Sequence, residues 1–133
     1  MSFAAVKEVQ VGVVSTLLAD SILMGRGLTG VFDEAPTDQA YPYISIGTKV
    51  QTPWKEFQRQ GYEVTLVLDI WTSLDGGDVH FDILDDVARL FDDKPLPLAS
   101  FASTQCVLEW TITLIDEDMT ARHTIARLRT INS

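Results

Sequence analysis

The amino-acid sequence predicts a protein of the α+β class, built from an antiparallel β-sheet with two helices packed on it. Apolar residues recur at spacings of three and four over residues 3–19 and 79–91, which indicates two helices with one buried face each. Apolar and polar residues alternate over residues 62–71 and 105–115, which is typical of strands. Hairpin connections between successive strands favour antiparallel pairing. The predicted order along the chain is α-β-β-β-α-β-β.

The first predicted helix covers residues 3–19 and is rich in valine. β-Branched side chains lower the intrinsic helix propensity, so burial against the rest of the domain must stabilise this element. Glycines then mark a loop, a short strand is expected at residues 31–33, and Pro42 favours an extended backbone before a strand over residues 43–47. The residues of the predicted buried stripe on the helix are Val6, Val9, Val13, Val14, Leu17 and Leu18.

Residues 48–61 form a long polar stretch before the next strand. Hairpin loops usually contain about 2–5 residues, so a stretch of this length either continues the strands or has a separate role. Its two aromatic side chains could pack back onto the domain, or the stretch could be an arm that contacts a neighbouring subunit, because aromatic residues are common in both settings. The candidate interface residues of this arm are Trp54, Lys55, Phe57 and Arg59.

The second predicted helix follows two glycines and is strongly acidic. Asp78 is placed to cap its start, and an i,i+4 ion pair between Asp85 and Arg89 would leave most of the acidic charge unpaired. The predicted buried stripe consists of Val79, Ile83, Val87, Leu90 and Phe91. The candidate exposed acidic residues are Asp75, Asp78, Asp82, Asp85 and Asp86, with Asp92 and Asp93 at the end of the helix.

The last two strands are predicted over residues 105–115 and 120–131, joined by an acidic turn at residues 116–118. The alternation in the first of them predicts a single apolar face. Cys106 lies on this face, so we expect a small buried hydrophobic side chain and not a nucleophile. The residues of the predicted face are Cys106, Leu108, Trp110, Ile112 and Leu114.

Length and composition predict a single domain over residues 1–133. With 46% hydrophobic and 22% charged residues, the chain is typical of a globular protein with its own core. A single cysteine excludes an internal disulfide. The first residues include charges where a secretory signal would be apolar, and no apolar run is long enough for a membrane span, so we expect a soluble protein made in the cytoplasm. The net charge of −9 disfavours tight binding of nucleic acid.

No catalytic, cofactor or metal motif is recognisable, so we expect a protein that is not an enzyme and needs no cofactor. His80 has no second histidine at helical spacing, and we expect it to be a solvated residue at the helix end. His123 has no partner motif in the sequence. The carboxylates do not follow the ligand spacing of a calcium loop. Phosphate-binding loops and the nucleophile elbow of hydrolases are also absent.

Five segments, taken in their order, resemble small tail-completion proteins of long-tailed phages and prophages, of the tail terminator or head–tail joining type. Each segment alone is a weak signal, and their order and spacing carry the resemblance, which extends from about residue 10 to residue 129. The segments are residues 17–20, 31–36, 41–47, 63–72 and 86–90.

The resemblance implies a structural virion protein that forms a ring, typically a hexamer, at the end of the tail tube, where it stops tail growth and joins the tail to the head. It implies further copies of the chain, a tail tube protein and a head connector or head-completion protein as partners. DNA would pass through the ring without specific binding. The arm would contact the neighbouring subunit, and the acidic residues would face the channel. The expected location is the virion tail, assembled in the host cytoplasm, with no membrane partner.

The main alternative is a small-molecule-binding or enzymatic α+β domain of bacterial origin, with a pocket between the sheet and the helices. Neighbouring genes for portal, capsid and tail-tube proteins would favour the phage protein, and a metabolic operon would favour the alternative. An acidic DNA mimic is a weaker option, because 10 basic residues dilute the 19 acidic ones.

Overall fold

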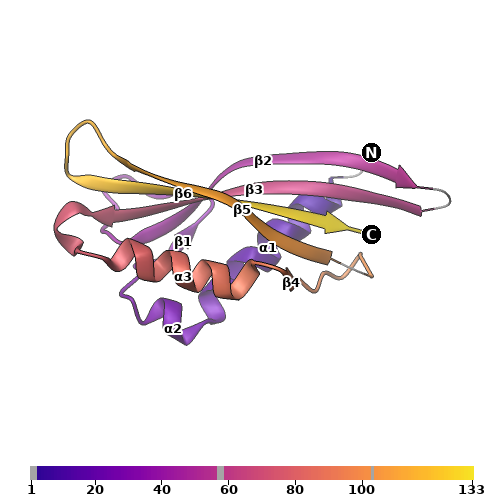
Figure 1. Cartoon of the computed structure of the whole chain (residues 1–133), viewed down its shortest axis with the longest axis horizontal. Helices are drawn as coiled ribbons and strands as arrows, with labels where there is room; N and C mark the ends of the chain where they lie inside the picture. Colours follow the sequence, from indigo (N-terminus) through magenta and orange to yellow (C-terminus); the bar gives the residue numbers. More distant parts are fainter. Residues whose placement is uncertain (1–2, 57–58, 103) are drawn as a thin grey trace.

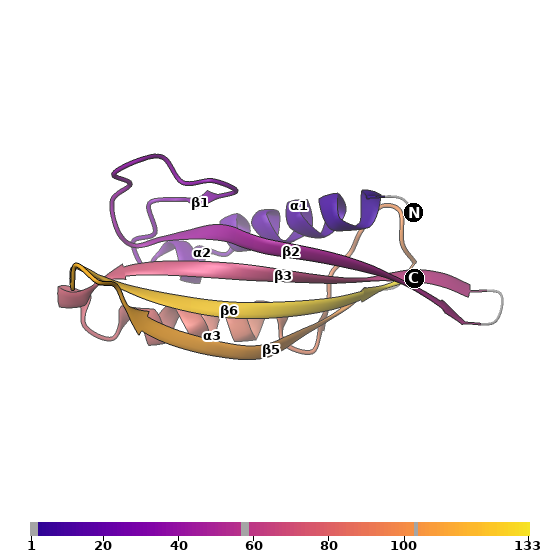
Figure 2. The same cartoon turned by 90° about the horizontal axis from the view of Figure 1, so that it is seen from above.

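The protein folds as a six-stranded sheet with its helices on one side (Figures 1 and 2). The computed structural model describes residues 3–56, 59–102 and 104–133, and for residues 54–56, 59 and 60 it describes the backbone alone. The elements are α1 Ala4–Ala19, α2 Ser21–Met24, β1 Val31–Phe32, β2 Tyr43–Glu56, β3 Arg59–Ser73, the 3-10 turn η1 Leu74–Gly76, α3 Val79–Phe91, β4 Lys94–Pro95, β5 Thr104–Ile115 and β6 Ala121–Asn132.

The sheet is mixed, which corrects the prediction of a purely antiparallel sheet. Its strand order is β1-β2-β3-β6-β5-β4. The four long strands pair antiparallel, whereas β1 pairs parallel to β2. The reason is local: residues 33–42 carry the chain back to the end of the sheet where β1 starts, so β2 begins beside β1 and runs in the same direction. The α+β class is confirmed, but two short elements that the sequence did not predict, α2 and β4, change the element order.

The two long helices cover different halves of the sheet. Figure 2 places α1 under the β1–β2 side and α3 under the β5–β6 side. The buried residues of α1 recur every four positions, as do the last three of the α3 stripe. Leu18, predicted to be buried, lies on the exposed side of α1. The residues that form these two buried stripes are Ala5, Val9, Val13 and Leu17 in α1, and His80, Ile83, Val87 and Phe91 in α3.

The hydrophobic core lies between these helices and one face of the sheet. Alternate residues of β3 point into it, as the sequence predicts, and β6 supplies Ala126 and Leu128 directly opposite Leu68 and Leu66. Because the interior between sheet and helices is filled by these side chains, it is a packed core. The β3 residues that face the core are Val64, Leu66, Leu68 and Ile70.

A β-bulge at Glu109 changes the predicted faces of β5. The pairing of β5 with β6 shifts register between Leu108 and Trp110. An extra residue in one strand turns every later side chain to the opposite face, because side chains alternate with a period of two. Cys106 and Leu108 therefore point to the core, while Trp110, Ile112 and Leu114 lie on the open face, opposite Arg127, Ile125 and His123 of β6. The prediction of one apolar face along all of β5 is wrong for its second half.

Candidate functional site

The hairpin formed by β2 and β3 extends past the end of its neighbour β6. β3 pairs with β6 from Tyr62 onward, where Tyr62 lies opposite Asn132. Beyond that point the described pairing joins β2 and β3 to each other, as far as Glu56 opposite Arg59. Figure 2 shows this hairpin projecting from one end of the molecule. The polar stretch over residues 48–61 is therefore not a long loop: its described residues continue the two strands β2 and β3.

Three of the four candidate interface residues of the arm belong to the described part of this hairpin. Trp54 and Lys55 lie in β2 and Arg59 lies in β3. Their side chains are outside the described part of the structure, and Phe57 is outside it altogether. Their contact with a neighbouring subunit stays a prediction.

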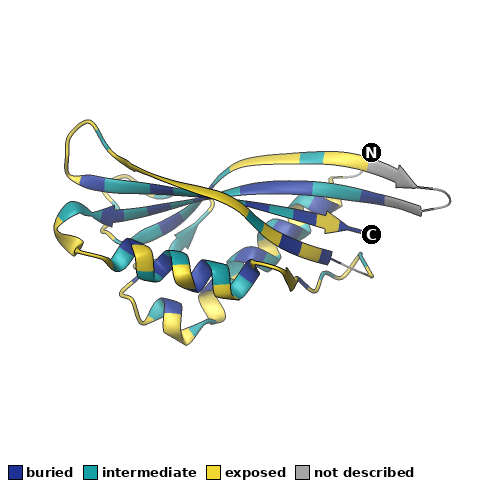
Figure 3. Ribbon diagram, viewed as in Figure 1, coloured by how far each residue is buried: buried dark blue, intermediate teal, exposed yellow. Residues whose placement is uncertain are grey.

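The second half of β5 exposes a large apolar surface. The side chains that the bulge turns outward, Trp110, Ile112 and Leu114, are 44%, 45% and 46% exposed. Ile115, on the other face of the strand, is also exposed. Figure 3 shows this half of β5 as a continuous exposed segment, in contrast to the alternating burial of its first half. Single exposed apolar side chains are normal, but a contiguous group of them marks an interaction surface.

An aromatic row crosses the open face of the sheet next to this surface. Tyr43 lies opposite Trp71, and Trp71 lies opposite His123. The rings of Trp71 and His123 are stacked with centroids 3.9 Å apart, and His123 Nε2 lies 2.7 Å from Asp69 Oδ1. His123, for which the sequence offers no partner, is therefore held by two residues of β3. The row packs across three strands, β2, β3 and β6.

Four of the five candidate acidic residues reach solvent. Asp75, Asp78 and Asp85 are exposed, and Asp82 is half-buried. Asp78 occupies the N-cap position of α3, but its side chain makes no capping hydrogen bond there, so the predicted side-chain cap is wrong. Asp92 and Asp93 are hydrogen-bonded to β5. Asp92 Oδ1 accepts a hydrogen bond from the Leu108 amide at 3.0 Å, and Asp93 Oδ1 accepts one from Gln105 Nε2 at 2.9 Å.

Asp86 differs from the other acidic residues, because its side chain is buried. Its carboxylate lies 3.0 Å from Arg26 Nε and 3.5 Å from Arg89 Nη2. A residue 3% exposed and neutralised within its own subunit cannot belong to an exposed acidic face. The sequence contains a signal that Asp86 is buried. It follows Ile83 by three residues and precedes Val87, and both belong to the buried stripe of α3, so helical spacing places Asp86 at the edge of that stripe.

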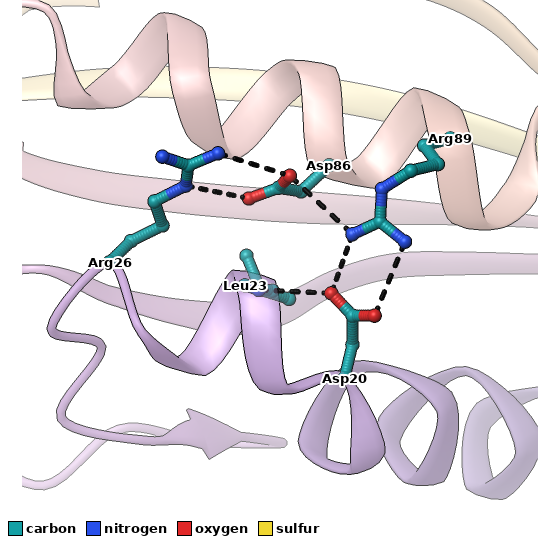
Figure 4. A network of polar contacts seen from close by, with 5 residues as sticks. All are labelled: Asp20, Leu23, Arg26, Asp86 and Arg89. Carbon is teal, nitrogen blue, oxygen red and sulfur yellow. Dashed lines mark hydrogen bonds and ion pairs between the residues drawn. The ribbon is translucent and has the colours of Figure 1, made fainter.

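Arg89 joins α3 to the end of α1 through Asp20 (Figure 4). Arg89 Nη2 lies 2.6 Å from Asp20 Oδ2, and this oxygen also accepts the Leu23 amide at 2.9 Å. The hydrogen bond from Arg89 and that from the amide hold the pKa of Asp20 below its ordinary value, and the two carboxylates raise the pKa of Arg89. This network takes the place of the predicted Asp85–Arg89 pair. Arg89 contacts Asp86 on its own helix and Asp20 at the junction of α1 and α2.

The two other residues weighed for chemistry are buried. His80 is 6% exposed, which corrects the expectation of a solvated residue, and its Nδ1 lies 3.2 Å from Arg122 Nη1. Burial, with a smaller contribution from the Arg122 charge, lowers the pKa of His80, so its ring is neutral at pH 7. Cys106 is fully buried as predicted, and burial raises the pKa of its thiol to about 11. A thiol with such a pKa is unreactive at neutral pH.

Within the described residues, no group of three or more His, Cys, Asp or Glu side chains could hold a metal ion. An open groove of about 570 Å³ lies between α1 and residues 96–99, lined in part by Val11, Leu96 and Leu98. It is an outer groove and not the interior pocket that the alternative function requires. No helix in the described part is long and apolar enough to cross a membrane.

A projecting hairpin and an exposed apolar strand are typical of subunits that assemble with other proteins. The chain belongs to the tail completion protein gp17 family, whose model matches residues 11–133. It is thus a structural protein of the phage tail, located in the virion, and the resemblance read from the sequence is confirmed. Between the two function classes, family membership favours the structural one over an enzyme.

Several solved structures are similar to the chain, among them two that cover almost its whole length. The first is a chain in the virion of a native gene transfer agent particle, with a TM-score of 0.86, 20% identity and coverage of 98% of each chain. The second is the gp17 protein of bacteriophage SPP1, with a TM-score of 0.56, 22% identity and coverage of 95% of this chain and 89% of that one. At these identities the likeness concerns the fold. No curated protein sequence matches the chain.

Proposed function

We propose that this protein forms a closed ring, expected to be a hexamer, at the end of the tail tube, where it stops tube growth and joins the tail to the head. The observation that carries the proposal is the half-exposed apolar segment of β5, because a subunit that worked alone would leave Trp110, Ile112 and Leu114 in water. Contacts between two different surfaces of identical subunits generate rings when the rotation closes. A chain of the same fold occurs in a virion particle, which is consistent with such an assembly.

The projecting β2–β3 hairpin is proposed to be the arm that contacts the neighbouring subunit, with Trp54, Lys55, Phe57 and Arg59 as its candidate contact residues. A hairpin that leaves its own sheet has unpaired strand edges and needs a partner to bury them. The tail tube protein is the proposed partner on one side of the ring, and the head connector or head-completion protein is the proposed partner on the other. DNA would pass through the centre without specific binding.

The deletion strain provides the direct test of this function. Without the protein, particles are expected to have tails of irregular length, or tails and heads that remain separate, because tube growth is not stopped and no surface receives the head. Electron micrographs of lysates measure both outcomes, and complementation with the intact chain is the control. Normal, joined particles in the deletion strain would disprove the proposal.

We propose in addition that four acidic residues, Asp75, Asp78, Asp82 and Asp85, face the DNA channel of the ring. Asp86 is omitted because it is buried and ion-paired. Carboxylates repel phosphates over about 8 Å at physiological salt, so DNA could slide without being held. The competing interpretation is that this face of α3 lies outside the ring and keeps the particle soluble.

Substituting three of these residues, Asp78→Lys, Asp82→Lys and Asp85→Lys, distinguishes the two interpretations. If they face the channel, we expect intact tails that deliver DNA slowly or incompletely, and more so at low salt, because lysines bind the phosphate backbone. The assay counts joined particles by microscopy and measures DNA delivery separately. A variant with lysines replacing Glu34, Glu117 and Asp118, which are exposed and lie outside α3, changes the net charge by the same amount and is the matched control. Unchanged delivery by the α3 variant would place this face on the outside.

A further inference from the structure

The open groove between α1 and residues 96–99 has one wall made by the helix and one made by leucines. Leu96 and Leu98 form the second wall, and Gly12 permits their close approach, since a Cβ at position 12 would lie 3.1 Å from Leu98 Cδ2. The volume of about 570 Å³ is within the range of about 300–1,000 Å³ that is typical of ligand pockets. Because positions four apart share one side of a helix, the α1 wall consists of an exposed row, Lys7, Val11 and Ser15, and a half-buried row, Glu8, Gly12 and Thr16.

α1 lacks the polar outer face that a helix at the surface of a protein normally has. Val11, beside the groove, is 58% exposed. By contrast, α3 exposes charged residues, among them Asp85 and Arg89. A helix that is apolar on nearly all sides is normally covered, so the outer side of α1 is a surface that another chain is expected to cover. The exposed residues of α1 include one charge and are Ala4, Lys7, Val11, Ser15, Leu18 and Ala19.

Glu8 provides a buried hydrogen-bond acceptor that lacks a donor in the wall of the groove. Its Oε1 accepts a hydrogen bond from the Ser100 amide at 3.0 Å, whereas its Oε2 is buried and has no hydrogen-bond partner among the described residues. An unpaired buried carboxylate oxygen costs free energy, so it indicates a donor that arrives with a binding partner. The occupant of the groove is therefore expected to combine apolar or aromatic side chains with a cationic donor.

We infer that this groove receives the tip of the β2–β3 hairpin, residues 54–61, from a neighbouring copy of the chain. This inference rests on the proposed ring and names the surface on which its arm binds. The tip reads Trp-Lys-Glu-Phe-Gln-Arg-Gln-Gly, with two aromatic residues and two basic residues against one acidic residue, in a chain whose net charge is −9. Aromatic side chains are common anchors in apolar pockets, and lysine and arginine supply the donor that Glu8 Oε2 lacks. The tip is thus complementary to the groove in polarity and in charge.

The tip of one chain cannot occupy the groove of the same chain. The Val6 amide donates a hydrogen bond to Gln51 Oε1 at 3.0 Å, which attaches the start of α1 to β2. From this point α1 runs back along the sheet, while β2 continues the other way into the arm (Figure 2). Along an extended strand Glu56 already lies about 17 Å beyond Gln51. Tip and groove of one chain therefore lie apart, and a tip bound in the groove comes from another copy.

Exchange of tips in this way is compatible with a closed ring. Each copy gives its tip and receives another through a different surface, and such contacts close into a ring when the rotation allows it. Rotation about the ring axis keeps every atom at the same height along that axis, so the tip and the groove of one chain must lie at equal height. Because the line from groove to tip follows the strands, the strands of the arm are expected to run around the ring and not along its axis.

Photo-crosslinking from the tip tests the inference in assembled particles. The change Phe57→p-benzoylphenylalanine, an aromatic residue that links to its neighbours on irradiation, is made in a gene that complements the deletion strain. We expect a band with the mass of two subunits, and mass spectrometry is expected to locate the link within residues 7–16 or 96–99. Val11→Glu in the groove is expected to lower the yield of this band about tenfold, because a charge there opposes the burial of an aromatic side chain.

Controls separate this inference from the proposed function. Phe81→Glu is the matched variant, because Phe81 on α3 is 57% exposed and Val11 is 58% exposed, and it is expected to leave the yield of the band unchanged. Thermal unfolding curves check that each variant is folded, and micrographs of the same particles record whether a ring is present. In particles with a ring, links from position 57 only to other segments or to another protein, or equal losses for the two variants, would overturn the groove as the binding site and leave the ring intact. Absence of a ring in wild-type particles would overturn both.

Discussion

Removing the tip of the β2–β3 hairpin is expected to abolish the joining of tails to heads while leaving the subunit folded. In the variant, residues 54–61 are deleted and Pro53 is connected through Asn-Gly to Tyr62, its partner in the β2–β3 pairing, because Asn-Gly favours a tight two-residue hairpin turn. The core residues that β3 contributes begin at Val64, so the deletion leaves them in place. The lost part is the one proposed to contact the neighbouring subunit. Infectious particles in a complementation assay are the measurement, with circular dichroism as the test of folding.

Two full-length controls identify which feature of the hairpin matters. Trp54→Ser with Phe57→Ser keeps the length and removes the aromatic side chains, and Lys55→Ser with Arg59→Ser removes the charges. If the aromatic residues anchor the arm, the first variant should approach the deletion and the second should remain close to the intact chain, because buried aromatic side chains dominate interface energies. A folded deletion variant that supports normal infectivity would exclude the hairpin from assembly.

Replacing Phe91 by alanine is expected to cost about 3–5 kcal/mol of the free energy of unfolding, because it leaves a large cavity in the core. Phe91 ends α3 and is only 1% exposed. Such a loss is a large fraction of the roughly 5–15 kcal/mol that stabilises a typical domain. Urea denaturation followed by circular dichroism measures it.

Phe81 provides a matched control on the same helix. It is 57% exposed, so Phe81→Ala removes the same side chain from a position that faces solvent. We expect a change of less than about 1 kcal/mol there. Equal losses at the two positions would contradict the assignment of the buried face of α3.

Much of the fold follows from local patterns in the sequence. α3 was predicted over residues 79–91 because an apolar stripe, two preceding glycines and the prolines after Lys94 define its face and both ends without reference to the rest of the chain. The core-facing residues of β3 were predicted for the same reason, since strict alternation has one interpretation when a strand is regular. The burial of Cys106 and the membership in a tail-completion family were also readable at this level.

Other features depend on contacts between segments that are distant in the sequence. Apolar residues at every second position from Cys106 to Leu114 give no sign of a bulge at Glu109, which only the pairing of β5 with β6 reveals. Asp86 looks like one more aspartate on an acidic helix until Arg26, 60 residues earlier in the chain, is folded against it.

The sequence by itself determined the two long helices and the regular parts of the long strands, since side-chain periodicity is a local property, but not the short elements α2 and β4. Only the tertiary structure decided which side chains meet water where that periodicity is interrupted or a distant segment covers them. The parallel pairing of β1, the projection of the β2–β3 hairpin and the apolar open face of β5 all depend on where one segment ends relative to another. A shift of one residue in a strand reverses its faces, so the surface on which assembly is proposed to depend was set by register and not by composition.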